Sequence, residues 1–281
     1  NFGFDHFNIG LSVCIQKMVR SDLASSGVAF SIDTESGFKN VVVINASLGL
    51  GELVVSGSIK PDEYIVHKYN NNASCPIIDK KLGNKTHKMV YGDYSQKTLT
   101  IPTNNNELTN FCLSNDNIVK LAKWTTEIED HYSFINKKWT PMDIEWAIDG
   151  LSNELFIVQA RPETVASKRK INTVTEYSIN NSNNNIILSG IAVGDKISSG
   201  CVKILTSLDT RLCNVEFKKG DILVADMTDP DWEPLMKISS GIITNKGGRA
   251  CHASIVAREL GIPAIVGTEN ATTQLKNNMT V

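Results

Sequence analysis

A polar, asparagine-rich stretch at residues 166–185, ASKRKINTVTEYSINNSNNN, divides this chain into two regions that must each bury a core of their own. The stretch has no apolar periodicity and has the composition of a linker. With 281 residues, the chain is long enough for two ordinary domains. We therefore expect a first domain at residues 1–165, a linker at 166–185 and a second domain at 186–281.

Both regions have the patterns of a mixed α/β (α+β) fold. The first region has the strand-like runs GVAFSID, VVVINAS, DEYIVHK, MDIEWAI and LFIVQAR. It also has a helical pattern at residues 116–132, whose apolar face consists of Ile118, Leu121, Ala122 and Ile128. The second region has glycine-punctuated strand patterns, among them DILVADM and GIITN, followed by one helix. Its runs are short, which predicts a compact β/α domain.

A histidine stands at the start of the helix predicted in GGRACHASIVARELGIP, residues 247–263. Gly261 and Pro263 provide the stop, and the helix is expected to begin near Cys251. Its apolar face, at spacing i, i+3, i+4, i+7, consists of Ala253, Val256, Ala257 and Leu260. His252 then lies in the first turn, where unpaired N–H groups and the helix dipole disfavour an imidazolium and favour an anion.

A neutral imidazole in this position is a nucleophile that could accept a phosphoryl group. The helix N–H groups, the backbone of Gly247 and Gly248, and the guanidinium of Arg249 would surround the new negative charge. The alternative is an ordinary capping or surface histidine, because glycine pairs and helix starts are common. The spacing alone leaves both interpretations open.

The segment PMDIEWAIDGLSNELFIVQARPETV, residues 141–165, predicts two strands joined by a loop. Alternation gives the first strand an apolar face of Met142, Ile144, Trp146 and Ile148 and a polar face of Asp143, Glu145 and Asp149. In the second strand the residues on one face are Leu155, Ile157, Gln159 and Arg161. A carboxylate, an amide oxygen and a guanidinium would then converge, which suits Mg²⁺ with a nucleotide phosphate. The alternative is a hairpin whose polar face is merely solvated.

Composition limits the partners and the compartment. The chain has 28 basic and 30 acidic residues, so its net charge of −2 gives no basic field for nucleic acid, and we expect no nucleic-acid partner. Its six cysteines form no CxxC pair and no metal-ligand spacing, which favours a reducing compartment. No apolar run approaches the ~18 residues of a membrane span, and no signal-peptide pattern opens the chain. We expect a cytoplasmic protein with no membrane partner.

Six segments together resemble the phosphoenolpyruvate synthase family, also called pyruvate, water dikinase. They are SSGVAFSIDTESGF, INASLGLGELVVSG, MDIEWAIDG, IVQARPETV, TDPDWEPLMK and TNKGGRACHASIVARELGIPAIVG. The likeness spans nearly the whole chain and weakens over residues 70–139. It implies a partial ATP-grasp domain followed by a swivelling phosphohistidine domain, in which a histidine takes the β-phosphoryl group of ATP and carries it to pyruvate.

The resemblance also implies roles for individual residues. His252 would be the phosphoryl carrier, Glu145 and Gln159 would be ligands of Mg²⁺ and ATP, and Arg161 would contact phosphate. The segment IQKMV is similar to the hinge whose backbone receives adenine, which implicates Gln16, Lys17, Met18 and Val19.

Two further assignments leave an alternative open. Asp33 occupies the place of a loop acid near the phosphates, but a turn aspartate is as plausible. Arg258, about two helical turns after His252, would either join Gly247, Gly248 and Arg249 in the phosphohistidine cradle or form a salt bridge. The turn GLGE, residues 49–52, is interpreted as structural.

The resemblance predicts that this chain is a fragment. The first half of the ATP-grasp domain would precede Asn1 and the pyruvate barrel would follow Val281, so the chain alone should be inactive and the full-length enzyme a homo-oligomer. Alternatives with the same domains are pyruvate phosphate dikinase, which usually has SHA where this chain has CHA, and a rifampicin-type phosphotransferase. A non-catalytic phosphocarrier is a third alternative, against which the segments DIEWA and VQARPE argue.

Ala250 replaces the threonine that the regulatory kinase of the family usually modifies, which predicts escape from that control.

Overall fold

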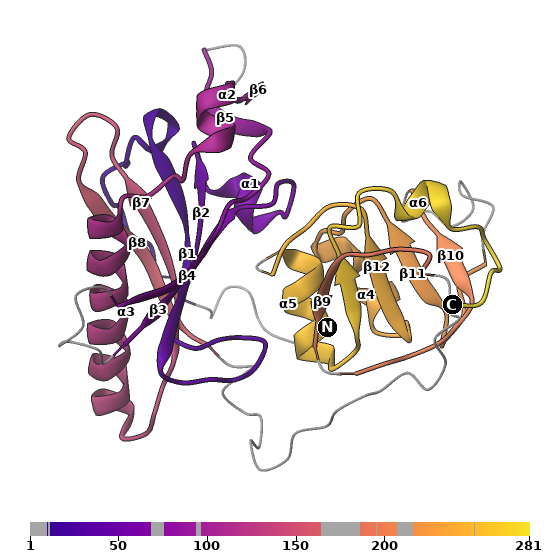
Figure 1. Cartoon of the computed structure of the whole chain (residues 1–281). Helices are drawn as coiled ribbons and strands as arrows, with labels where there is room; N and C mark the ends of the chain where they lie inside the picture. Colours follow the sequence, from indigo (N-terminus) through magenta and orange to yellow (C-terminus); the bar gives the residue numbers. More distant parts are fainter. Residues whose placement is uncertain are drawn as a thin grey trace.

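The protein is described from a computed structural model, which covers residues 10, 12–68, 76–93, 97–163, 186–194, 196–206, 216–249 and 251–281. The predicted linker at residues 166–185 and Ala250 lie outside the described residues. The chain forms two lobes that lie side by side, the first built by residues up to 163 and the second by residues from 186 (Figure 1). Both lobes contain helices and sheets, so the predicted mixed α/β fold class is confirmed.

The first lobe is built on a six-stranded antiparallel sheet in the order β4-β3-β2-β1-β7-β8. Its strands are β1 (Ser25–Phe30), β2 (Val41–Leu48), β3 (Asp62–His67), β4 (Ile77–Lys81), β7 (Met142–Ile148) and β8 (Leu155–Pro162). Five of them coincide with the predicted strand runs. The exception is β4, an edge strand with mostly exposed side chains and no alternation in its sequence.

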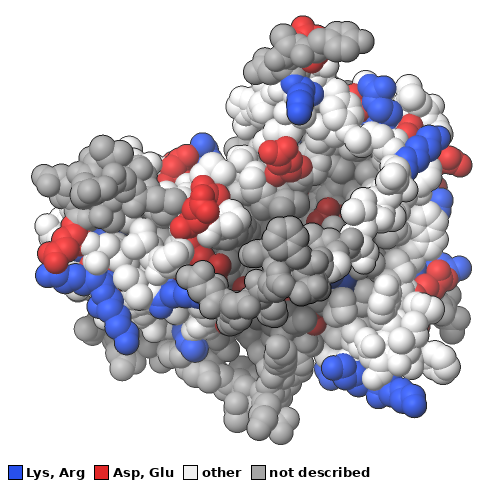
Figure 2. All heavy atoms as spheres, turned by 180° about the vertical axis from the view of Figure 1, so that it is seen from behind, with Lys and Arg blue, Asp and Glu red and all other residues white. Residues whose placement is uncertain are grey.

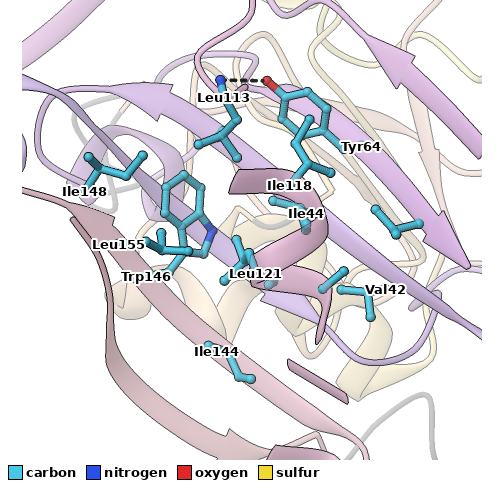
Figure 3. Packing of buried hydrophobic residues seen from close by; sticks show 14 of the residues in the cluster. Val42, Ile44, Tyr64, Leu113, Ile118, Leu121, Ile144, Trp146, Ile148 and Leu155 are labelled. Carbon is cyan, nitrogen blue, oxygen red and sulfur yellow. Dashed lines mark hydrogen bonds between the residues drawn. The ribbon is translucent and has the colours of Figure 1, made fainter. Parts of the chain in front are cut away.

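One long helix, α3 (Asn115–Asn136), covers one face of this sheet (Figure 1). It begins at Ser114, whose hydroxyl accepts a hydrogen bond from the Asn117 N–H. Ile118, Leu121 and Ala122 are buried against the sheet and Ile128 is partly buried there, which confirms the predicted apolar face. Figure 3 shows this core, in which the helix side chains pack against strand residues such as Ile44, Ile144 and Trp146.

The opposite face of the sheet carries shorter elements. They are η2 (Ser21–Leu23), α1 (Glu52–Val55), the two-stranded sheet of β5 (His87–Tyr91) and β6 (Thr98–Pro102), and α2 (Asn105–Thr109). A small apolar cluster anchors α1 and β5, in which Leu53 and Val54 of α1 and Met89 of β5 pack with Val28 and Phe30 of β1. This cluster covers only part of the face, and the remainder is available for a binding site.

The strict alternation predicted for β8 is wrong at Val158. Glu145 pairs with Gln159, but the next residue of β7, Trp146, pairs with Ile157, so Val158 is an extra residue in a β-bulge. The bulge turns Ile157 toward the core, while Gln159 lies on the same face as Glu145. The convergence of the polar side chains therefore depends on an irregularity that simple alternation does not contain.

The second lobe has a five-stranded sheet in the order β10-β11-β12-β13-β9. Its strands are β9 (Ile191–Val193), β10 (Val202–Ile204), β11 (Ile222–Ala225), β12 (Gly241–Thr244) and β13 (Ala264–Val266). The helical elements are η4 (Pro230–Trp232), α4 (Glu233–Met236), α5 (His252–Leu260) and α6 (Ala271–Gln274). Strands β10 to β13 are parallel, and only β9 pairs in the antiparallel direction, with β13.

Helix α5 has the bounds that the sequence predicts. Cys251 is its N-cap, and Gly261 ends it in the left-handed conformation with φ of 65°. Ala253, Val256 and Ala257 are buried in the core of the second lobe. His252 is consequently the first residue of the helix.

The surface carries both signs of charge. On the face shown in Figure 2, basic and acidic side chains of the described residues are scattered without a large patch of one sign, in agreement with the net charge of −2. Within the described parts of the chain, no helix is both long enough and apolar enough to span a membrane.

Candidate active site

A cavity of about 700 Å³ is lined by residues from both lobes. The first lobe contributes residues 16–19, Val158 and Glu145, and the second contributes residues 227–230 and His252. The structure therefore brings together three parts of the sequence-predicted site that are far apart along the chain: the adenine hinge, one metal-ligand candidate and the carrier histidine.

The segment at residues 16–19 is held in place by side chains around it. The Gln16 amide donates to the carbonyl oxygen of Val158 at 3.4 Å, and the Tyr91 hydroxyl donates to Met18 Sδ at 3.0 Å. Among the described residues, the backbone N–H and C=O groups of Lys17 and Met18 have no hydrogen-bond partner. Unpaired backbone donors and acceptors at a cavity wall suit the edge of a planar base such as adenine.

His252 is half-buried, and its Nδ1 lies 3.1 Å from the hydroxyl oxygen of Thr228. With Nδ1–H donating to that oxygen, the lone pair of the neutral ring is on Nε2, which has no hydrogen-bond partner in the described chain. Burial lowers the pKa of His252 from its ordinary value, and the carboxylates of Asp229 and Glu233 raise it by less. The neutral form expected at the helix start is thus favoured first by burial, a cause the sequence did not reveal.

Glu145 and Gln159 are directly opposite each other on adjacent strands. Such side chains have Cβ atoms roughly 4.5–5.5 Å apart and can share one ligand. Glu145 lines the cavity and forms no direct hydrogen bond or ion pair with any described residue, whereas Gln159 is exposed beside it. Burial, followed by the nearby Asp143, raises the pKa of Glu145. A half-buried carboxylate without a partner, next to an amide oxygen, fits the oxygen-ligand chemistry of Mg²⁺.

Arg161 is one step further along the same pair of strands. It is opposite Asp143, and its guanidinium forms an ion pair with that carboxylate at 2.7 Å. Arg161 does not line the cavity, and 55% of its side chain is exposed. The ion pair fixes Arg161 beside the Glu145 and Gln159 pair, and its contact with phosphate stays a prediction.

Asp33 is not among the residues that line the cavity. Its Oδ1 accepts the backbone N–H of Glu35 at 3.0 Å, and its Oδ2 accepts the hydroxyl of Ser36. Both oxygens therefore close the turn between β1 and β2. These bonds are those of a turn aspartate, and the alternative, an acid near the phosphates, stays a prediction.

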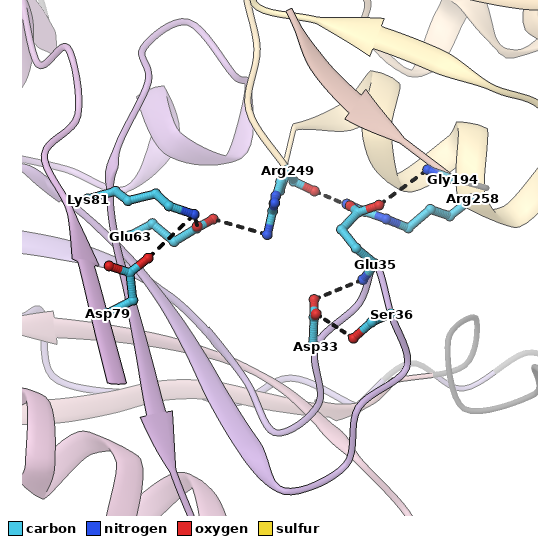
Figure 4. A network of polar contacts seen from close by, with 9 residues as sticks. All are labelled: Asp33, Glu35, Ser36, Glu63, Asp79, Lys81, Gly194, Arg249 and Arg258. Carbon is cyan, nitrogen blue, oxygen red and sulfur yellow. Dashed lines mark hydrogen bonds and ion pairs between the residues drawn. The ribbon is translucent and has the colours of Figure 1, made fainter. Parts of the chain in front are cut away.

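The two arginines of the predicted phosphohistidine cradle contact carboxylates of the first lobe (Figure 4). Arg249 is 3.6 Å from the carboxylate of Glu63. Arg258 forms an ion pair with Glu35 and donates to the backbone oxygen of Arg249 at 2.7 Å. For Arg258, the salt bridge is thus the alternative that the structure shows. Gly247 precedes them with φ of 125°, a backbone conformation that favours glycine.

Sequence reasoning gave no role to several residues of the site. Thr228 and Asp229 lie in the segment TDPDWEPLMK, which begins three residues after the last residue of β11. Gly51 and Glu52 of the GLGE turn also line the cavity. Because β11 and β12 are parallel, the loops that follow them emerge at the same edge of the sheet, and the second of these loops leads to His252. A threonine and an aspartate a few residues after a buried strand were the available signal.

Comparison with known proteins agrees with this geometry. The family described as "Pyruvate phosphate dikinase, AMP/ATP-binding domain" matches residues 1–181, and the one described as "PEP-utilising enzyme, mobile domain" matches residues 217–281. The chain is similar to proteins named phosphoenolpyruvate synthase from Aquifex aeolicus (54% identity over 280 residues), Helicobacter pylori (52% over 287) and Escherichia coli (48% over 287).

These alignments cover 98%, 99% and 99% of this chain but only 32%, 35% and 34% of the three relatives. The chain therefore spans about a third of the length of the curated relatives that it matches. The cavity lined by residues 16–19, by Glu145 of β7 and by His252 of α5 agrees with the two matched domains. We conclude that the chain belongs to the pyruvate phosphate dikinase AMP/ATP-binding domain family and continues into a PEP-utilising mobile domain.

Proposed function

We propose that this chain is part of a phosphoenolpyruvate synthase, which forms phosphoenolpyruvate, AMP and phosphate from pyruvate, ATP and water. The observation that carries the proposal is the single cavity lined by residues 16–19, Glu145 and His252. ATP would bind there, and His252 would receive its β-phosphoryl group. Pyruvate would bind elsewhere in the full-length protein. The matched relatives have about two thirds of their length outside the part that this chain matches.

In the proposed reaction, the backbone of residues 16–19 receives adenine, and Glu145 with Gln159 holds Mg²⁺, which would neutralise charge on the phosphates. His252 Nε2 attacks the β-phosphorus. The N–P bond forms as the bond from that phosphorus to the AMP oxygen breaks, which leaves the β- and γ-phosphoryl groups on His252. Water then attacks the γ-phosphorus, its bond to the bridging oxygen breaks, phosphate leaves and the β-phosphoryl group stays on the histidine. When Nδ1–H donates to the Thr228 hydroxyl, the attacking Nε2 has its lone pair free.

The test is labelling of the full-length protein with β-labelled ATP and Mg²⁺. We expect label on His252, in a phosphoramidate that is labile in acid and stable in base. His252→Asn should abolish it, whereas His131→Asn, an exposed position on α3, should leave it unchanged. Label that persists in His252→Asn would contradict the proposal.

A second comparison tests the metal site. Glu145→Gln removes the anionic oxygen but keeps the shape, and it should reduce labelling most strongly at limiting Mg²⁺. Glu154→Gln, which removes an exposed carboxylate from the loop between β7 and β8, is the matched control. Equal labelling in the two variants would show that Glu145 is only a strand residue.

Phosphate and pyrophosphate as products separate two members of this family of reactions. Water as the second acceptor yields phosphate, as proposed here, whereas phosphate as the acceptor yields pyrophosphate, as in a pyruvate phosphate dikinase.

We also propose a cytoplasmic location, supported by the free thiols of Cys14, Cys112, Cys201 and Cys251. Homo-oligomerisation of the full-length enzyme stays a prediction from the resemblance.

A further inference from the structure

The loop between β1 and β2 reaches the second lobe through Glu35, and both oxygens of its carboxylate contact that lobe (Figure 4). One oxygen forms an ion pair with the guanidinium of Arg258, on the same helix as His252. The other accepts a hydrogen bond from the backbone N–H of Gly194, which follows β9, at 3.2 Å. One side chain of the first lobe thus contacts two separate elements of the second.

The turn that carries Glu35 is held in place within the first lobe. The carboxylate of Asp33 accepts the Glu35 N–H at 3.0 Å, and the Gly37 N–H donates to the Asp33 carbonyl at 2.8 Å. The Asp33 N–H in turn donates to the carbonyl of Phe38 at 3.0 Å. These bonds order the loop before the second lobe arrives, which reduces the entropy lost when Glu35 meets Arg258.

The contact is also shielded from water. The side chain of Arg258 is 5% exposed and that of Glu35 is 17% exposed, so screening by salt is weak at this point. Among the described residues, a second ion pair between the lobes, Arg249 with Glu63, is longer at 3.6 Å, and Arg249 is 30% exposed. A charge pair of the second kind contributes little, whereas removing one partner of a shielded pair leaves the other charge without compensation.

We infer that Glu35 is a positioning residue for phosphoryl transfer, which holds the second lobe in the orientation that directs His252 into the cavity. It acts through Arg258 and the Gly194 amide and does not touch the reacting atoms. The inference rests on the proposed function, because a carrier histidine must leave this position to meet its second acceptor. Glu35 therefore assists the step at the ATP site and has no part in the step at the other acceptor.

The experiment compares two routes to the same phosphohistidine in the full-length protein. His252 is labelled from β-labelled ATP with Mg²⁺ in one assay and from labelled phosphoenolpyruvate in the other. Glu35→Gln should slow labelling from ATP by about tenfold or more, as expected for a truncated interface charge pair, and leave labelling from phosphoenolpyruvate unchanged. The matched control is Glu127→Gln, since Glu127 forms an exposed ion pair with Lys123 within α3 and should affect neither assay.

An equal loss in both assays would indicate a merely structural role and overturn the inference, as would an unchanged rate from ATP. Hydrogen exchange at the Gly194 amide gives a readout that does not depend on catalysis. Exchange there should be faster in Glu35→Gln than in the wild-type protein and unchanged in Glu127→Gln. Failure of ATP to label His252 in the wild-type protein would defeat the proposed function, while the exchange result would still decide whether Glu35 holds the lobes together.

Discussion

The hydroxyl of Thr228 lies 3.1 Å from His252 Nδ1, where it can accept a hydrogen bond from the ring N–H and leave the lone pair on Nε2. Replacing it in Thr228→Val removes one hydrogen bond of about 1–1.5 kcal/mol. We expect labelling of His252 from ATP to slow by about tenfold, since 1.4 kcal/mol corresponds to one factor of ten. Thr228→Ser keeps the oxygen and should retain most of the rate in a single-turnover measurement. A serine variant as slow as the valine variant would show that the methyl group, and not the hydroxyl, is what matters.

The lowered pKa of His252 predicts how phosphorylation depends on pH. The neutral ring is the nucleophile, and burial keeps it neutral below the ordinary imidazole pKa of about 6.5. The labelling rate should therefore stay level as pH falls to about 6.5 and decline only below the lowered pKa. The free energy of unfolding changes with pH in the same direction. The unfolded chain gains the proton on His252 first, so the stability that the neutral buried ring contributes is lost as pH falls below about 6.5. A labelling rate that already declines on acidification while the pH is still above about 7 would contradict this assignment.

Within the first lobe, Asp62 at the start of β3 ties several segments together. Its carboxylate pairs with the fully buried ammonium of Lys85, and it accepts the backbone N–H groups of Gly83 and Cys112, each at 2.8 Å. Asp62→Ala leaves Lys85 buried without its partner and should lower the free energy of unfolding by about 3–5 kcal/mol. Asp79→Ala, which breaks an exposed pair, should cost less than about 1 kcal/mol. Urea denaturation of both variants checks the difference.

Elements specified by local signals could be predicted from the sequence. Helix α5 has its apolar spacing, its stop at Gly261 and its start near Cys251 all within a few residues, and its bounds were predicted correctly. The β7 and β8 strands were found by alternation for the same reason. Short strands such as β5 and β6, with polar and half-exposed side chains, carry no such signal.

Features that depend on distant partners could not be predicted. The bulge at Val158 exists because β8 must match β7, a register set by packing across the strands. The hydrogen bond between Thr228 and His252 depends on the parallel order of β11 and β12. The ion pair of Glu35 with Arg258 joins residues 223 positions apart, and no local pattern indicates it.

For the molecule as a whole, the approach of the two lobes can be obstructed at one glycine. A Cβ atom on Gly57, in the loop after α1, would lie 2.2 Å from Cys251 Cβ and 3.0 Å from Gly247 Cα, both in the second lobe. Gly57→Ala should therefore hold the lobes apart and slow labelling from ATP by about tenfold or more, while labelling from phosphoenolpyruvate is retained.

Gly57 also has φ of 75°, so backbone strain must be controlled for. Gly220 has φ of 95° and no atom within 4 Å of its added Cβ, so Gly220→Ala carries the strain without an obstruction. Both variants should lose similar stability in urea, but only Gly57→Ala should slow the ATP assay. Equal rates in the two variants would show that the loop at Gly57 does not limit the approach of the lobes.

The wall of the cavity formed by residues 227–230 and His252 belongs to the second lobe. Under the proposed function, His252, which accepts the phosphoryl group, thus also closes one side of the cavity that holds the donor. When the second lobe is turned away, a bound nucleotide faces bulk solvent at the position of the imidazole. Water then competes with His252 as the phosphoryl acceptor. How closely the two lobes pack then sets how many ATP molecules are consumed for each phosphohistidine made. A cavity built from the first lobe alone could not control this ratio.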